Sequence, residues 1–96
     1  MAYSTSNPPV CISYGPIHNG QAGRIWWYSS PDALSVVRVA GYFTNGYDLG
    51  MRAGDIIFIL DNDASPLALS VSLVNAATAS QVDLADGTAI ASTDTD

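Results

Sequence analysis

The sequence has no lysine and no glutamate, and it contains one cysteine and one histidine among its 96 residues. The single cysteine, Cys11, excludes an internal disulfide framework and a zinc site built from cysteines. The single histidine, His18, excludes a metal centre that needs several histidine ligands. A chain of this length is expected to form one domain with a thin core.

Positive charge is scarce, because the only basic residues are three arginines, whereas nine aspartates give a net charge of -6. Charged residues make up 12% of the chain, which is half of the usual share of about 25%. This balance argues against nucleic acid as a partner. It also argues against electrostatic binding to a membrane surface.

Long hydrophobic runs are also absent. The longest strictly apolar run, residues 56–60, is too short to span a bilayer. Residues 1–7 lack the charged and apolar regions of a signal peptide. The sequence therefore predicts a soluble, acidic structural or binding module that is made inside the cell.

Residues 1–23 are predicted to be an extended N-terminal arm without helix or central strand. They hold three of the five prolines and three of the eight glycines, which disfavour both kinds of structure. Their apolar residues set them apart from a disordered tail and predict a surface on which the arm lies. Both this chain's own domain and a neighbouring protein remain open as that surface. The candidate partner-binding residues of the arm are Tyr3, Pro8, Pro9, Val10, Ile12, Tyr14 and Ile17.

Residues 24–91 are predicted to be a compact β domain. Residues 24–29 are rich in aromatics and predict a strand with a large ring on each face, so that both faces are expected to be covered. The Ser-Pro-Asp at 30–32 is typical of a helix start. It predicts one short helix that ends at Gly41.

The strongest strand signal is the run 55–60, which is apolar on both faces and therefore predicts a central strand. The preceding Gly-Asp pair predicts a tight turn that aspartate stabilises by accepting hydrogen bonds from nearby amides. After a turn at 61–66, residues 67–74 alternate between apolar and small residues. The alternation is interpreted as placing four side chains toward the core: Leu67, Leu69, Val71 and Leu73.

The last part of the domain is predicted to be a hairpin, because Ala-Asp-Gly at 85–87 lies between short strands at 81–84 and 88–91. Residues 92–96 are predicted to be a polar, frayed C-terminal tail. The expected fold is mainly β, a small barrel or sandwich of about five strands with one short α-helix and the extended arm.

No enzymatic signature is present. The sequence lacks a Gly-x-Ser-x-Gly element and a phosphate-binding glycine loop. The Asp-Asn-Asp at 61–63 is similar to the start of a calcium loop, but Pro66 occupies the glycine position and no glutamate follows. We expect no catalysis, no metal and no cofactor.

Six of the nine aromatic residues lie within the 22 positions from 26 to 47. Such a cluster is first expected to form the core. Tryptophan and tyrosine also dominate binding hot spots, and a carbohydrate-stacking platform remains an alternative. The candidate interface aromatics are Trp26, Trp27, Tyr42 and Tyr47.

Several short motifs occur in a characteristic order. An aromatic strand leads into Ser-Ser-Pro-Asp-Ala-Leu at 29–34, followed by Gly-Tyr-Phe at 41–43 and Asp-Leu-Gly-Met-Arg-Ala-Gly-Asp at 48–55. An apolar strand and an aspartate come next. This order resembles small virion structural proteins of tailed bacteriophages and prophages, and the resemblance covers residues 24–91.

The resemblance implies a capsid cement (decoration) protein that binds the outer surface of the major capsid protein shell and stabilises it. It implies a homo-oligomer located on the virion, with a trimer favoured and a dimer open, made in the cytoplasm of the host bacterium. The alternative is a head-fibre, tail-spike or fibre base or adhesin domain that binds a virion partner or a host glycan. For the cement function, the arm is expected to order on docking, and deletion of residues 1–17 is expected to leave a folded domain.

Overall fold

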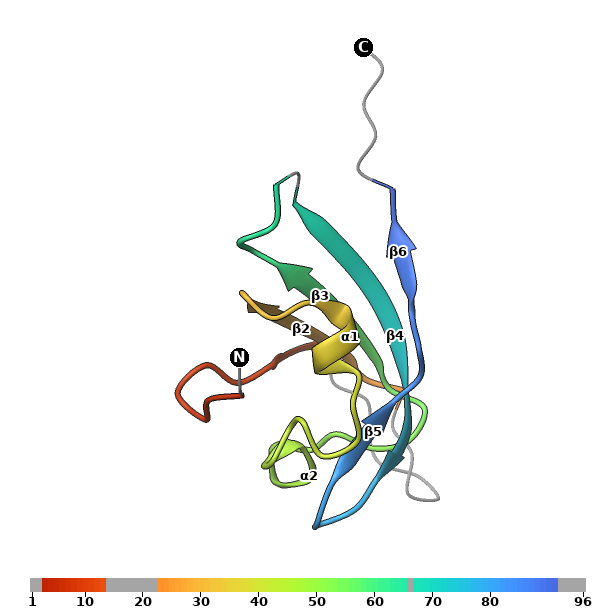
Figure 1. Cartoon of the computed structure of the whole chain (residues 1–96). Coiled ribbons are helices and arrows are strands. Elements are labelled where there is room, and N and C mark those ends of the chain that lie inside the picture. Colours follow the sequence, from red (N-terminus) through yellow and green to blue (C-terminus); the bar gives the residue numbers. More distant parts are fainter. Residues whose placement is uncertain (1–2, 14–22, 66, 92–96) are drawn as a thin grey trace.

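The computed structural model describes residues 3–13, 23–65 and 67–91, which form a mainly β domain around one sheet (Figure 1). The prediction of a mainly β fold is confirmed. The sheet is not closed, so the structure does not show a barrel. In chain order the elements are β1 (Val10–Ser13), β2 (Ile25–Ser30), α1 (Leu34–Val37), α2 (Gly46–Leu49), β3 (Ile56–Asp61), β4 (Ala68–Ala77), β5 (Val82–Leu84) and β6 (Thr88–Ile90).

The sheet is mixed, with the order β1-β2-β3-β4-β5 and with β6 also paired to β4. Only β2 and β3 are parallel to each other among the described pairs. Parallel strands need a crossover connection, and here the crossover carries α1 and α2. Because β3 lies between β2 and β4, the predicted central strand is confirmed.

The core lies on the face of the sheet that the crossover covers. Trp26 and Tyr28 of β2 and Ile57 and Ile59 of β3 point to this face, as their pairing register requires. They pack against Val37 of α1, against the rest of the crossover, and against residues of β4 and β5. The remaining buried hydrophobic residues of the cluster are Phe43, Met51, Val74, Val82 and Leu84.

The turn before β3 has the predicted chemistry. Gly54 has a φ of 95°, a left-handed conformation that favours glycine. The buried Asp55 accepts hydrogen bonds from the backbone N–H of Arg24 (3.0 Å) and Arg52 (3.1 Å) and from the indole N–H of Trp26 (2.9 Å). The carboxylate thereby joins the starts of β2 and β3.

The predicted facing of β4 is wrong. Ser70 and Ser72 point into the core and are 6% and 5% exposed, since they pair with Ile59 and Ile57 of the buried face. Their small side chains leave room for the chain that follows β5, and the Ser72 hydroxyl donates to the carbonyl of Ala85 at 2.7 Å. The residues that were expected to face the core lie away from it: Leu67, Leu69, Val71 and Leu73.

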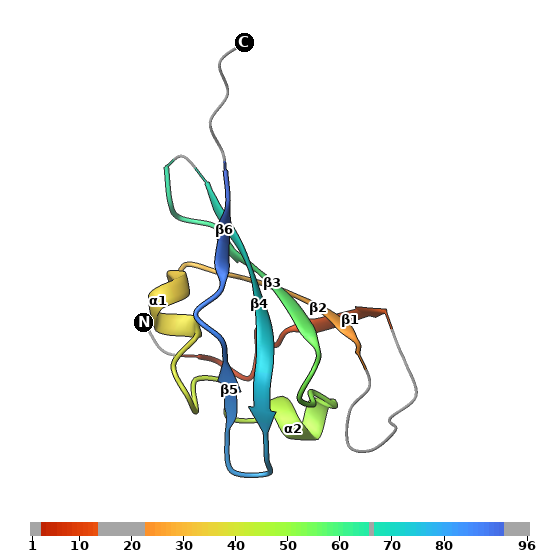
Figure 2. The same ribbon diagram turned by 90° about the vertical axis from the view of Figure 1, so that its right-hand side faces the viewer.

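The predicted hairpin at 85–87 is also wrong. β5 and β6 both pair with β4, through Val74 with Leu84 and Leu69 with Ile90. Figure 2 shows β5 and β6 in line along the same strand. Gly87 has a φ of 82°, the left-handed conformation expected of an Asp-Gly turn. At this point, however, the chain continues along β4 from β5 to β6 and does not reverse.

The first helix is shorter and starts later than predicted. Ser30 ends β2, and its hydroxyl accepts a hydrogen bond from the backbone N–H of Asp32 at 3.1 Å. This contact closes a turn, and α1 begins only at Leu34. It ends at Val37, before Gly41.

The second helix was not predicted, because the sequence analysis expected only one short helix, ending at Gly41. Gly46 is the first residue of α2, and a Cβ at this position would lie 2.7 Å from Cγ2 of Val82. Glycine therefore allows the helix to approach the core closely at this point.

Part of the arm has regular structure. Val10–Ser13 form β1, which pairs with β2 in an antiparallel orientation at the edge of the sheet. The arm was predicted to hold no helix and no central strand, and the strand that its described residues form is an edge strand. Residues 3–13 lie against this chain's own sheet, because Tyr3 packs against the core cluster as well.

Candidate functional site

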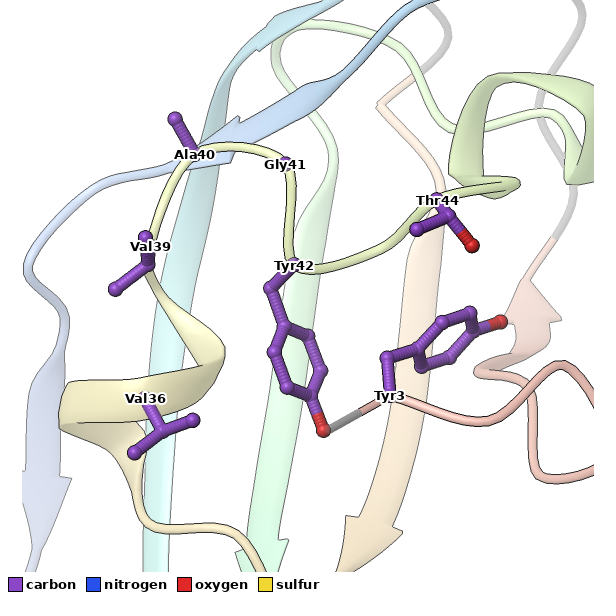
Figure 3. A pocket seen from close by; sticks show the side chains of 7 residues that line it. All are labelled: Tyr3, Val36, Val39, Ala40, Gly41, Tyr42 and Thr44. Atoms are coloured by element: carbon purple, nitrogen blue, oxygen red, sulfur yellow. The ribbon is translucent and has the colours of Figure 1, made fainter. Parts of the chain in front are cut away.

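Two apolar surfaces lie on opposite sides of the sheet layer. The first is a pocket of about 440 Å³ on the side of α1, which we call the tyrosine pocket (Figure 3). The ring of Tyr42 lies between Val36 of α1 and Tyr3 of the arm. The lining residues are Tyr3, Val36, Val39, Ala40, Gly41, Tyr42 and Thr44.

Tyr3 is held in the tyrosine pocket by several contacts. Its ring centroid lies 6.1, 5.6 and 5.2 Å from those of Tyr28, Tyr42 and Phe43. Its hydroxyl donates to Oδ1 of Asn45 at 2.6 Å. The structure therefore brings together Tyr3 and Tyr42, which the sequence analysis proposed separately as partner-binding residues.

The hydroxyl of Tyr42 belongs to a chain of hydrogen bonds. It donates to Oδ2 of the buried Asp32 at 2.5 Å and shares a hydrogen bond of 2.8 Å with the hydroxyl of Tyr28. Burial raises the pKa of Tyr42 well above its usual value, and the hydrogen bonds to Asp32 and Tyr28 raise it further. The hydroxyl therefore stays protonated and acts as a fixed donor.

Replacing Tyr42 by phenylalanine is expected to lower the free energy of unfolding at pH 7 by about 2 kcal/mol, because the buried Asp32 loses a donor. The raised pKa of Tyr42 means that the unfolded state loses this proton first, so wild-type stability falls as the pH rises above about 10. The variant lacks this contribution. The difference in the free energy of unfolding between wild type and Tyr42→Phe should therefore be smaller above about pH 10 than at pH 7.

Urea unfolding followed by tryptophan fluorescence at neutral and alkaline pH measures this difference. Tyr47→Phe is the control, because the Tyr47 ring lies outside the hydrogen-bond chain and under the guanidinium of Arg52, 3.7 Å from its centroid. A difference that stays constant across the pH range would contradict the assigned role of the Tyr42 hydroxyl.

The second surface, which we call the open face, is the side of the sheet away from the crossover. Its positions follow from the pairing register of β1, β2, β3, β4 and β6. Ten are apolar, three carry hydroxyls and none is charged. They are Val10, Ser13, Ile25, Trp27, Ser29, Ile56, Phe58, Leu60, Leu69, Val71, Leu73, Thr88 and Ile90.

The open face leaves large side chains accessible. Trp27, Ile56 and Leu73 are 37%, 40% and 45% exposed, and the Trp27 ring lies 6.0 Å from that of Phe58. The expectation that both faces of β2 are covered is therefore wrong for the described residues of this chain. A sheet with one solvated face normally carries polar residues there, and a large apolar patch in their place marks an interaction surface.

A hollow of about 390 Å³ lies at one side of the open face. Ile56, Val71, Leu73 and Thr88 of the open face line it, together with the chain around Ala85. The hollow therefore lies over β4 and β6, whereas Trp27 projects from β2 on the other side of β3.

The remaining candidate residues are distributed over the domain. Trp26 lies in the core and not at the surface, and Tyr47 lies outside both apolar surfaces. Pro9 is buried and Pro8 is half-buried, whereas Ile12 is exposed on β1. Tyr14, Ile17 and His18 lie outside the described residues.

The described residues offer no metal centre, since no group of three or more His, Cys, Asp or Glu side chains could hold an ion there. Over the same part of the chain, no helix is long and apolar enough to cross a membrane. Cys11 is a free, half-buried thiol at the edge of the core, where its sulfur donates to the carbonyl of Ser13.

The open face was missed by the sequence analysis, although a signal for it was present. The run 56–60 is apolar on both faces, and residues 69–73 alternate apolar residues with serine. Had the serine side been assigned to the core, the apolar side would have predicted this surface.

Comparisons with protein-family models, with curated proteins and with solved structures find no match to this chain. Its function is therefore inferred from its own residues and geometry. The tyrosine pocket and the open face are the two features from which that inference starts.

Proposed function

We propose that the chain is a capsid cement (decoration) protein that binds the outer surface of the major capsid protein shell of a tailed bacteriophage and stabilises the shell. The observation that supports this function is that the domain presents an apolar surface on each side of its sheet: the open face, and the tyrosine pocket formed by the arm and the crossover. A protein that fastens others together needs contacts on more than one side. In this assembly, a partner layer covers the open face.

The charge distribution agrees with this function. A net charge of -6 keeps copies soluble before they reach the shell. The open face carries no charge, so docking there does not bury an ionised group. The ordered motifs that resemble tailed-phage virion proteins support the same function.

The tyrosine pocket is the proposed contact with the capsid. Val36 and Val39 leave apolar surface exposed at its rim, and its volume accommodates an apolar side chain of the shell protein. The Tyr42 ring is fixed by the hydrogen bond of its hydroxyl to Asp32. Because the Tyr42 ring is already fixed, less conformational entropy is lost when a partner binds the pocket.

A glycan-binding fibre or spike domain is the second candidate, and the exposure of Trp27 favours it. A sugar could stack on this ring. Recognition of a sugar also needs hydrogen-bonding groups beside the ring, and among the described residues the open face offers only the hydroxyls of Ser13, Ser29 and Thr88. The cement function therefore has the stronger support.

The proposal is tested by adding the purified protein to capsids that lack it. The capsids come from a phage whose genome encodes this sequence. Val39→Asp should weaken binding by about tenfold or more, because it places a carboxylate at an apolar contact. Leu67→Asp is the matched control, since Leu67 and Val39 are 56% and 57% exposed and Leu67 lies outside the tyrosine pocket. Equal binding of both variants would contradict the assigned contact.

Electron cryo-microscopy of the virion gives an independent test of the cement function. Copies spread over the whole shell are expected. Copies confined to one vertex or to the tail would overturn the proposal in favour of a fibre or spike domain. Binding to a glycan array would also favour a fibre or spike domain if the Trp27→Ala substitution abolished it.

A further inference from the structure

We infer that the open face binds a second copy of this chain, about a two-fold axis that runs along β3. The two sheets then pack face to face as a sandwich, with the open faces as its core. This inference extends the proposed function by specifying the oligomer.

The charge pattern favours a second copy as the occupant. In a two-fold interface the same patch is used on both partners. Any charge near its centre would therefore meet the same charge of the partner, at a cost of several kcal/mol. The chain carries a net charge of -6, yet no described aspartate occupies an open-face position of β1, β2, β3, β4 or β6. A partner of opposite charge would instead be met by acidic side chains on this face.

The shape of the open face is self-complementary. The register places Trp27 of β2, Phe58 of β3 and Val71 of β4 in one row across the sheet. Rotation by half a turn about an axis above β3 carries β2 over β4. Trp27 of each copy then lies over Val71 of the partner subunit, where the hollow of about 390 Å³ opens.

The area agrees with a pair of moderate affinity. Five strands at about 4.8 Å spacing, each with alternate positions about 7 Å apart, give a face of roughly 450 Å² per copy. Two such faces bury roughly 900 Å², close to the roughly 1,000 Å² that specific complexes need. A trimer would require two different patches on each copy, whereas the open face is a single patch. The geometry therefore favours a dimer over the trimer implied by the resemblance.

Sedimentation of the purified full chain over a range of concentrations tests the pairing. The mass should rise from 10.0 kDa to twice that value. Leu73→Asp should weaken association by about tenfold or more, because it places a carboxylate within the interface. Val39→Asp should leave association unchanged, because Val39 lies on the other side of the sheet. A monomer at millimolar concentration, a trimer, or a dimer that resists Leu73→Asp would overturn the inference.

A cross-linking experiment tests the axis and does not depend on a destabilising charge. In a Cys11→Ser background, Ile56→Cys and Leu73→Cys are matched, because the two residues pair in the sheet and are similarly exposed. On the proposed axis, Ile56 lies opposite Ile56 of the partner subunit at about 10 Å. Leu73 lies opposite Ile25 of the partner subunit, and the two Leu73 positions are about 14 Å apart.

A short bis-maleimide should therefore link two copies of the Ile56→Cys chain much faster than two copies of the Leu73→Cys chain. Equal rates would overturn the proposed axis, and the absence of linked dimers in both would overturn the pairing. Neither experiment contains capsid protein. A chain that pairs but does not bind shells would contradict only the cement function, and a monomer that binds shells would contradict only this inference.

Discussion

Replacing Asp55 by alanine is expected to lower the free energy of unfolding by about 4 kcal/mol, roughly twice the loss expected for Tyr42→Phe. Its carboxylate accepts from the indole N–H of Trp26 and from the backbone N–H groups of Arg24 and Arg52. The substitution removes this acceptor from the buried indole N–H of Trp26 and from the two half-buried backbone N–H groups. Each buried donor left unsatisfied costs about 1–3 kcal/mol.

Urea unfolding followed by far-UV circular dichroism measures this loss, because Trp26 fluorescence would itself be altered. Asp55→Asn should lose less, since its amide oxygen still accepts from one or two of the donors. Asp48→Ala is the control for the removal of one negative charge at an exposed position. A loss below about 1 kcal/mol for Asp55→Ala would show that the carboxylate does not join β2 to β3.

The features around Asp55 were predictable because their signals are local. A glycine before an aspartate and an apolar run identifies a left-handed residue, a hydrogen-bonding side chain and a strand within a few positions of one another. The observed φ of Gly54 and the contacts of Asp55 confirm this interpretation. The central position of β3 followed from the apolar character of both its faces, although one of these faces proved to be open.

The facing of β4 could not be read in the same way. Alternation defines two faces of a strand, but a shift of one residue exchanges them. The serines face inward because the chain after β5 crosses close to β4, where Ser72 donates to the carbonyl of Ala85. That contact joins residues 13 positions apart. No local sequence pattern around Ser72 predicts this hydrogen bond.

The Asp-Gly pair at 86–87 illustrates the same limit. Its backbone conformation was predictable, because Gly87 takes a positive φ. Its topological role was not, since β4 is long enough to pair with β5 and β6 one after the other. β6 pairs with residues of β4 that β5 leaves unpaired, so it does not need to form a hairpin with β5.

The candidate surfaces depend on contacts that are still more distant in sequence. The hydroxyl of Tyr3 donates to Asn45, 42 positions away, so the tyrosine pocket could not be assembled from spacing alone. The sequence analysis identified Tyr3 and Tyr42 as candidates from residue type. Only the fold brings them into one pocket.

Deletion of residues 1–13 is expected to lower the free energy of unfolding by about 4 kcal/mol or more, out of a total of about 5–15 kcal/mol for a domain of this kind. The deletion removes β1 from the edge of the sheet and the ring of Tyr3 from its contacts with Tyr28, Tyr42 and Phe43. Each such ring pair contributes about 0.5–1.5 kcal/mol. From sequence alone, deletion of residues 1–17 was expected to leave a folded domain, whereas the contacts of residues 3–13 predict a large loss of stability.

Chemical unfolding of the full and shortened chains decides between these expectations. Tyr3→Ala should account for about half of the loss, because it removes the ring contacts and leaves β1 in place. Ile12→Ser is the control for the arm itself, since Ile12 is exposed and contributes little to the core. A shortened chain within about 1 kcal/mol of the full chain would show that the arm's contacts with its own sheet are dispensable. In that case the arm would be free to bind a neighbouring protein, and shell binding by the shortened chain would measure how much it contributes there.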